Sequence, residues 1–486
     1  MPDMKIAFLA SEVIPYAKTG GLADVAGALP KFLSRLGSEV RVFMPFYREV
    51  RARNLPLRTA IGQAALDTPG GKKEYSVLEH RADGFSVYFI ARDEYFDRDC
   101  LYGTAAGGDY PDNGERFAFF ARASLEAMRG VGFSPDVVHG HDWQSASAFA
   151  YLKFVLADDP FFKKAGSLFT VHNLAYQGLF GREVLAAVGL PERLFNMNDL
   201  EFFGKVNYMK AGILYAAAVN TVSPRYSREI QTPEFGCGLD GLLRWRSHAL
   251  SGILNGVDYA DWNPTTDKLI PARYSPADLS GKAGSKAGLL AMFGLRDEPR
   301  IPVAGMVTRL AGQKGVDIVC EALEDIFRLG LKVVILGTGD KKIQDFLTEA
   351  KKKYPGRLGL MIAFDEKVAH TIYAGSDFFL IPSRYEPCGL TQMYSLKYGT
   401  VPVVRATGGL DDTIQDFEPQ AGTGNGFKFE EASAAALVSC LRRALDVYAR
   451  PDQWLTLTRN TMAADYSWTR SAGEYLKLYG KIKERS

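Results

Sequence analysis

The feature that most restricts the fold is residues 375–412, where a strand, a turn and a helix are followed at once by a second strand. Phe378–Pro382 is a short apolar run that ends at a proline, which is typical of a buried strand. Apolar residues with helical spacing follow from Leu390, and Gly399 is the residue type that commonly ends a helix. Val401–Val404 predicts the second strand. Strands that alternate with helices in this way predict a parallel sheet in an α/β domain.

The turn between this strand and this helix has the composition of a ligand-binding loop. The N-terminus of a helix carries main-chain N–H groups without partners and the positive end of a dipole, and it therefore attracts phosphate. Glu386 lies just before it, where a carboxylate would repel phosphate but accept hydrogen bonds from sugar hydroxyls. The combination favours a phosphorylated sugar. The alternative at this point is an ordinary loop with an exposed glutamate.

Two other loops have a similar character. Arg309 and Lys314 follow an apolar strand, and two cations on a glycine-containing loop suit a diphosphate. Lys18 precedes the paired glycines Gly20 and Gly21, which would let a ligand approach the backbone. A solvated loop in the first case and a tight turn with a solvated lysine in the second remain alternatives.

We expect neither a metal ion nor a nicotinamide cofactor. His139 and His141 have the spacing of a metal pair, but no carboxylate or thiol cluster accompanies them in the sequence. Asp97 and Asp99 resemble a motif that holds a metal against a diphosphate, but Arg98 between them would oppose a cation. Residues 337–339 (GTG) lack the third glycine of a dinucleotide fingerprint. The predicted cofactor set is therefore empty.

The net charge, the cysteine content and the length of the apolar runs exclude several classes of protein. The formal net charge of +2 gives no reason to expect a nucleic acid or an anionic membrane as partner. The five cysteines lack CxxC spacing and indicate reduced thiols of the cytoplasm. The most apolar run, 211–219, is shorter than the roughly 18 residues that a membrane span needs. We therefore expect a soluble, cytoplasmic protein, whose oligomeric state cannot be read from the sequence.

The order of predicted elements indicates two domains. One series of alternating strands and helices begins at residue 5, and hairpins at 54–92 and a long loop at 97–114 are inserted in it. A second series begins at residue 303. We predict an N-terminal domain over 1–248 that is completed by a C-terminal helix within 466–486, and a second domain over 249–465. Both are expected to be doubly wound α/β domains that face one another across a cleft.

Several motifs, taken together and in order, resemble the bacterial glycogen synthase family, the retaining glucosyltransferases related to plant starch synthases. The resemblance covers essentially the whole chain. The residues that carry it are Lys18–Leu22, His141–Trp143, Thr170–Gly178, Leu254–Asp258, Arg309 with Lys314, Pro382–Gln392 and Thr407–Leu410.

This resemblance implies a fold of two Rossmann-like domains, the GT-B type, with the C-terminal helix crossing back onto the N-terminal domain. It also implies transfer of glucose from ADP-glucose to the non-reducing 4-hydroxyl end of an α-1,4-glucan such as glycogen, with retention of the anomeric configuration. No metal is implied. A UDP-glucose donor and a non-catalytic glucan-binding protein are the alternatives.

The resemblance also implies roles for individual residues. The implied catalytic residues, which act on the diphosphate, the donor glucose or the reacting end, are Glu386, Arg309, Lys314, Asp142 and His172. The implied donor-binding residues are Lys18, Gly20, Gly21, Asn255, Phe364, Cys388, Gly389, Leu390 and Thr391. Within these sets Phe364 would lie near the base. One position departs from related transferases, which often have a glutamate for the ribose where this chain has Tyr394.

Overall fold

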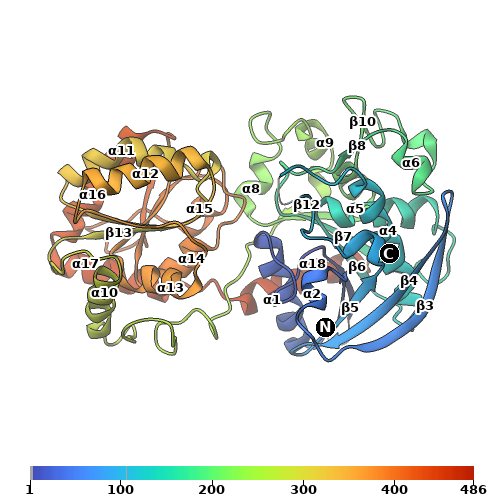
Figure 1. Ribbon diagram of the computed structural model, residues 1–486, viewed down its shortest axis with the longest axis horizontal. Coiled ribbons are helices and arrows are strands. Elements are labelled where there is room, and N and C mark those ends of the chain that lie inside the picture. Colours follow the sequence, from blue (N-terminus) through green and yellow to red (C-terminus); the bar gives the residue numbers. More distant parts are fainter. Residues whose placement is uncertain (1–3, 105–106, 486) are drawn as a thin grey trace. The chain divides into compact units, whose positions relative to one another are not determined.

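The computed structural model describes residues 4–104 and 107–485 and divides into two compact units. The first unit runs to Val222 and continues over Ser227–Ile253 and from Trp468 onward. The second comprises Ser223–Tyr226 and Leu254–Ser467. Figure 1 shows that each is built around a sheet with helices packed against it.

The first unit contains a nine-stranded sheet in the order β12-β11-β7-β6-β1-β2-β5-β4-β3. Its strands are β1 (Lys5–Leu9), β2 (Glu39–Pro45), β3 (Arg58–Thr68), β4 (Gly71–Arg81), β5 (Ser86–Ala91), β6 (Val137–His141), β7 (Gly166–Val171), β11 (Ala218–Thr221) and β12 (Leu250–Gly252). The neighbouring pairs are parallel except for those of β4 with β3 and with β5. The hairpin predicted at the edge of this sheet is therefore confirmed. The inner strands β1 and β6 are buried along almost their whole length, as expected where helices cover both faces.

The helices of this part of the chain include the C-terminal one. They are α1 (Gly21–Arg35), α2 (Arg48–Arg51), α3 (Asp93–Phe96), α4 (Asn113–Gly130), α5 (Asp142–Phe154), α6 (Val184–Ala187), α7 (Tyr208–Tyr215), α8 (Pro224–Glu229), α9 (Asp240–Trp245) and α18 (Trp468–Lys483). The apolar face of α18 packs beside α1, and Tyr475 and Tyr479 on it are fully buried. A small sheet of β8 (Leu179–Phe180), β10 (Lys205–Asn207) and β9 (Glu201–Phe202) completes the unit.

The second unit contains a six-stranded parallel sheet in the order β15-β14-β13-β16-β17-β18. Its strands are β13 (Val303–Val307), β14 (Lys332–Leu336), β15 (Leu358–Met361), β16 (Phe378–Ile381), β17 (Val401–Arg405) and β18 (Phe427–Phe429). Its helices are α10 (Ser280–Met292), α11 (Val316–Arg328), α12 (Lys341–Lys353), α13 (Glu366–Gly375), α14 (Thr391–Lys397), α15 (Gly408–Thr413), α16 (Ala434–Tyr448) and α17 (Pro451–Ala463). Figure 1 shows α11, α12 and α16 on one face and α10, α13 and α14 on the other, and a separate apolar core lies on each face.

Both large sheets have a point at which the strand order reverses. In the first unit β1 is followed by β2 on one side, whereas β6 lies on the other. In the second unit β13 is followed by β14 on one side, whereas β16 lies on the other. In open α/β sheets, ligands bind beyond the carboxyl ends of the strands at such a point. Ligand-binding residues are therefore expected on the loops after β1, β6, β13 and β16.

Three details differ from the sequence-based expectations. The first unit continues past the predicted boundary at 248 because β12 pairs with β11 as an edge strand. After the second predicted strand, Val401–Val404, the chain forms a short helix, α15, which begins at Gly408 with Thr407 before its first turn. The expected loop at 97–114 contains a bridge between Gly103 and Asp109, and residues 105 and 106 lie outside the described residues. No helix within the described ranges combines the length and the apolarity needed to cross a bilayer.

Candidate active site

The structure brings Lys314 and Glu386 together at the reversal point of the second sheet. Lys314 Nζ lies 2.6 Å from Glu386 Oε2, and Ser383 Oγ donates to the same oxygen at 3.1 Å. Both charged side chains are largely buried, which strengthens their attraction and makes the loss of either partner costly. A cation and a carboxylate are therefore held side by side beyond the carboxyl ends of β13 and β16.

The backbone of these two loops is packed tightly enough to fix the pair. Gly315, which follows Lys314, has φ +66°, and a Cβ at this position would collide with the carbonyl oxygen of Pro382 at the end of β16. Arg384 N donates to Gln313 O at 2.9 Å. The loop after β13 thus rests directly on the loop after β16, which explains why residues 72 positions apart meet.

The turn before α14 is held from within by Gln392, whose Nε2 donates to the carbonyl oxygens of Cys388 and Gly389, each at 3.0 Å. Helix α14 begins at Thr391, after Leu390, as predicted. Burial raises the pKa of the Cys388 thiol to about 12, so this sulfur is not a thiolate near neutral pH.

Asn255 lies beside this turn, because its main chain makes a hydrogen bond to the Cys388 thiol. Its Oδ1 is buried and has no hydrogen-bond partner in the described part of the chain. Buried polar atoms in native proteins nearly always have a partner, so this oxygen is a candidate ligand contact.

Arg309 and Phe364 are exposed on the same unit. Arg309 donates to Gln313 Oε1 at 3.2 Å, and the phenyl ring of Phe364 is 89% exposed. A guanidinium and an aromatic ring that the fold does not bury are suited to contact a phosphate and a planar base.

In the first unit, Asp142 comes directly after β6 with φ +51°, an uncommon conformation for a residue other than glycine. Its Oδ1 accepts a hydrogen bond from His172 N at 2.7 Å, and the main-chain N–H of Asn173 is a further donor to the carboxylate. Desolvation nevertheless raises the pKa of Asp142 to about 7. Backbone strain and a perturbed pKa on one residue at a sheet reversal point mark a functional candidate.

His172 follows β7 and is held by a second histidine, since His141 Nδ1 lies 2.9 Å from His172 Nε2. Burial lowers the pKa of His172 to about 3. His172 is therefore neutral throughout the pH range in which proteins are normally assayed. A neutral imidazole can offer a hydrogen bond to a sugar hydroxyl without carrying a charge.

The loop with Lys18 depends on Glu12, which the sequence analysis did not single out. The Glu12 carboxylate accepts hydrogen bonds from Thr19 Oγ1 at 2.7 Å, from Gly20 N at 3.0 Å and from Tyr102 OH at 2.6 Å. It is only 4% exposed. In the sequence, the indication of a role for Glu12 is its position just after the first buried strand, at the carboxyl edge of the sheet. Lys18 itself pairs with Asp24 at 2.7 Å, and Gly21 begins α1.

We expect Glu12→Gln to weaken donor binding. The Gln amide retains one oxygen but places an NH₂ group against main-chain N–H donors, so the glycine turn loses part of its support. Loss of one charge-assisted hydrogen bond corresponds to a rise of about tenfold in the KM for the nucleotide sugar. Steady-state kinetics measures this. Glu115→Gln is the matched control, because Glu115 also accepts from a tyrosine, Tyr95, but lies away from the turn. An equal rise in both variants would contradict the assignment.

The motifs set aside as metal ligands have other partners. Arg48 bonds Asp97 at 2.6 Å and also pairs with Asp99. His139 contacts Tyr479 OH through Nδ1 and Thr170 Oγ1 through Nε2. Within residues 4–104 and 107–485 no three His, Cys, Asp or Glu side chains are grouped as metal ligands would be.

Three aromatic residues near the predicted site residues in the sequence serve the packing of the fold. Tyr95 and Phe96, two neighbouring aromatic residues after β5, are both buried in the core. Tyr394, at the position of the absent glutamate, is stacked on Trp262 with ring centroids 3.8 Å apart. This position therefore contributes to packing.

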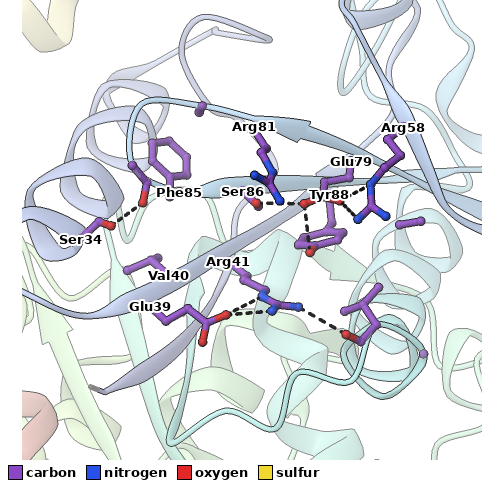
Figure 2. A pocket seen from close by; sticks show the side chains of 15 residues that line it. Ser34, Glu39, Val40, Arg41, Arg58, Glu79, Arg81, Phe85, Ser86 and Tyr88 are labelled. Atoms are coloured by element: carbon purple, nitrogen blue, oxygen red, sulfur yellow. Dashed lines mark hydrogen bonds and ion pairs between the residues drawn. The ribbon is translucent and has the colours of Figure 1, made fainter. Parts of the chain in front are cut away.

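A cavity of about 700 Å³ lies elsewhere in the first unit, beside β2, β4 and β5 (Figure 2). Its charged groups largely satisfy one another, since Arg58 pairs with Glu79 and Arg41 pairs with Glu39. None of the residues predicted to be catalytic or donor-binding lines it.

Comparison with known proteins identifies the family of the chain. The protein-family model for the starch synthase catalytic domain matches residues 5–245, and that for glycosyl transferases group 1 matches residues 294–459. The glycogen synthase of Koribacter versatilis is 48% identical over 99% of both chains, and that of Geotalea uraniireducens is 48% identical over 98% of both.

Solved structures show the same relationship. The catalytic domain of starch synthase IV from Arabidopsis thaliana, solved with ADP and acarbose, matches with a TM-score of 0.90 and 33% identity over 99% of both chains. Sucrose-phosphate synthase from Thermosynechococcus elongatus shares the fold, with a TM-score of 0.61 at 18% identity. The predicted fold class, two doubly wound α/β units of the GT-B type, is confirmed. The chain belongs to the glycogen and starch synthase family of glycosyltransferases.

Proposed function

We propose that this enzyme is a glycogen synthase that transfers glucose from ADP-glucose to the non-reducing 4-hydroxyl end of an α-1,4-glucan, with retention of configuration. The observation that carries the proposal is the buried Lys314–Glu386 pair at the sheet reversal point. It supplies a cation for a diphosphate and a carboxylate for sugar hydroxyls within one small volume. The starch synthase IV structure that contains ADP supports the adenine nucleotide.

Stabilisation of the departing diphosphate is the main electrostatic task of such an enzyme. Cleavage of the sugar–phosphate bond concentrates negative charge on the leaving oxygen, and fixed positive groups lower the barrier most effectively. Lys314 and Arg309 are these groups in our proposal, together with the main chain of Gly389–Thr391 before α14. Glu386 accepts hydrogen bonds from the donor glucose. In the first unit, His172 is the residue that we propose as a sugar contact. Phe364 packs against the base.

Retention is explained by attack of the acceptor on the face from which the diphosphate leaves. The carboxylate of Asp142 accepts hydrogen bonds from the main chain of His172 and Asn173. Asp142 therefore orients the loop that carries His172. In the same-face attack, the departing phosphate takes the proton of the acceptor hydroxyl. Isolation of a covalent glucosyl–enzyme adduct would contradict this proposal.

We expect the transfer to proceed without a metal ion. Lys314 and Arg309 carry the positive charge that a divalent cation would otherwise bring to the diphosphate. Activity measured after exhaustive dialysis against EDTA should equal that of the untreated enzyme, and added Mg²⁺ should not raise it. A loss on chelation that Mg²⁺ restores would contradict this expectation.

The test of the proposal is a donor comparison. The protein is incubated with glycogen and either ADP-glucose or UDP-glucose, and release of the nucleotide is measured together with the length of the glucan chains. Release with ADP-glucose that depends on glycogen is the expected result. Preference for UDP-glucose would change the donor but keep the reaction, and binding to glycogen without release would indicate a glucan-binding protein.

We also propose that the protein is cytoplasmic. All five cysteines are free, which fits this location.

A further inference from the structure

The turn that joins β9 to β10 has an unusual sequence for its geometry. Phe202 pairs with Lys205, so the connection has two residues, Phe203 and Gly204. Both have positive φ, +48° and +77°, which is the pattern of a type I′ turn. Asparagine or aspartate followed by glycine is favoured in this turn, because these residues adopt the left-handed conformation at little cost. This chain places a phenylalanine there instead.

The phenylalanine also gains nothing by burial, because its side chain is 85% exposed. A bulky residue in the left-handed region is strained, and an exposed phenyl ring leaves apolar surface in water. Local rules broken without a gain in folding free energy occur characteristically at functional positions. Phe203 therefore needs an explanation outside folding.

Neighbouring residues hold the exposed ring of Phe203 in place. Phe202 contacts it edge to face, with centroids 4.7 Å apart and planes at 82°. The loop at Gly238 lies against both rings, since a Cβ on this glycine would be 2.9 Å from Phe202 and 3.5 Å from Phe203. Gly238 also has φ +80°, so glycine is required there on two counts. The exposed ring is thus supported from beneath.

The hairpin is tied to the segment that carries His172. Asn207 Nδ2 donates to Gln177 Oε1 at 2.6 Å, and Gln177 Nε2 donates to Cys237 O at 3.0 Å. Gln177 lies five residues after His172, and Tyr176 beside it is 56% exposed. The side chain of Gln177 therefore links the segment that carries a candidate sugar-binding residue to the hairpin with the exposed aromatic turn, at the β8–β10 end of the unit in Figure 1.

We propose that Phe203, with Tyr176, is a binding site for an α-glucan chain outside the catalytic residues. Aromatic faces pack against the C–H face of a pyranose ring, and they need no deep pocket to do so. The two rings are separate exposed side chains, and they form less apolar surface than a specific protein interface of roughly 800 Å² per partner requires. This inference rests on the proposed function, because a polymeric acceptor makes a second contact useful. A chain held at Phe203 raises the effective concentration of glucan ends at the enzyme.

The test uses Phe203→Asn, because asparagine is the residue that this turn favours. The variant should fold with an unchanged or higher melting temperature, so a loss of binding cannot be ascribed to unfolding. We expect about threefold to tenfold weaker binding to glycogen, the size of one aromatic contact, measured by co-sedimentation with glycogen in the absence of nucleotide. The KM for glycogen should rise by a similar factor, whereas the KM for ADP-glucose should not change.

Two further variants make the result specific. Phe203→Tyr keeps an aromatic face and should bind glycogen as the wild type does. Phe346→Ala removes an exposed phenyl ring, 49% exposed on α12, and should leave glycogen binding unchanged.

Equal glycogen binding by the wild type and Phe203→Asn would overturn the inference. So would a change in oligomeric state of Phe203→Asn without a change in glycogen binding, since the ring would then serve a protein contact. These outcomes are independent of the proposed function, because co-sedimentation needs no turnover. Absence of nucleotide release from ADP-glucose would instead refute the proposed function.

Discussion

Replacement of Lys314 by alanine should reduce kcat with ADP-glucose and glycogen by about 10²–10³-fold, as removal of one fixed donor to a developing charge does in other enzymes. The ammonium group lies on the loop after β13, where the diphosphate is proposed to leave. Its charge becomes more valuable as the sugar–phosphate bond breaks, so the loss should be seen in kcat more than in the KM for the donor. Undiminished turnover would refute the assignment of Lys314.

The same substitution also leaves the Glu386 carboxylate with Ser383 as its one side-chain partner among residues 4–104 and 107–485, so a decrease in stability is expected as well. Arg309→Ala separates the two effects. Arg309 is exposed and bonds only Gln313 among the contacts seen, so its loss should reduce kcat while the melting temperature stays within the error of the wild type. If Lys314→Ala lost activity only in proportion to its loss of folded protein, its role would be structural.

Replacement of Asp142 by asparagine should lower activity by about 10²-fold while raising stability at alkaline pH. The amide can no longer accept from the main-chain N–H groups of both His172 and Asn173, and a shift of a loop by about 1 Å can cost this much in rate. Asparagine tolerates the φ of +51° at this position, so the backbone has no reason to rearrange. Stopped assays of kcat across pH give the first measurement.

The pH dependence of both properties follows from the pKa of Asp142. Desolvation raises it from the ordinary 3.8 to about 7, so between these pH values the folded protein retains a proton that the unfolded chain has released. The wild type therefore loses stability as pH rises from about 4 to about 7, and Asp142→Asn does not. Each kcal/mol gained should appear as about 2–4 °C in melting temperature at pH 8.

Wild-type activity should behave in the opposite sense, because the ionised carboxylate is the better acceptor for two N–H groups. We expect kcat to rise through pH of about 7 in the wild type and to lack this step in Asp142→Asn. His172 cannot produce the step, since burial holds its pKa near 3. A wild-type profile without an acid limb near pH 7 would show that Asp142 is not the group that titrates.

Most of the fold could be predicted because its information is local. The strand at Phe378 and the helix that ends before Gly399 lie within one short stretch, and the strand at 303–307 is a plain apolar run bounded by turn residues. The small β8–β10–β9 sheet could not be predicted, since its strands have two or three residues and depend on Gln177 and Asn207 to hold them.

The site was only partly readable for the same reason. Lys314 and Glu386 were identified separately, each from its own loop, but their ion pair depends on the close packing of Gly315 against Pro382. Glu12 was missed because its importance comes from Tyr102 and Thr19, and no pattern in the sequence shows that these residues converge. The raised pKa of Asp142 is likewise a property of its surroundings.

Helix α18 has a consequence for how the protein is made. It follows the whole second unit in the sequence, yet Tyr479 bonds His139 in the first sheet, and Lys483 pairs with Asp136 at 2.7 Å. During synthesis on the ribosome, the first unit therefore lacks α18 until the whole second unit has been made, and the surface that α18 covers is exposed during that time. We expect chaperones that recognise apolar surface to bind this partly synthesised chain at β6 and β7, which α18 later covers.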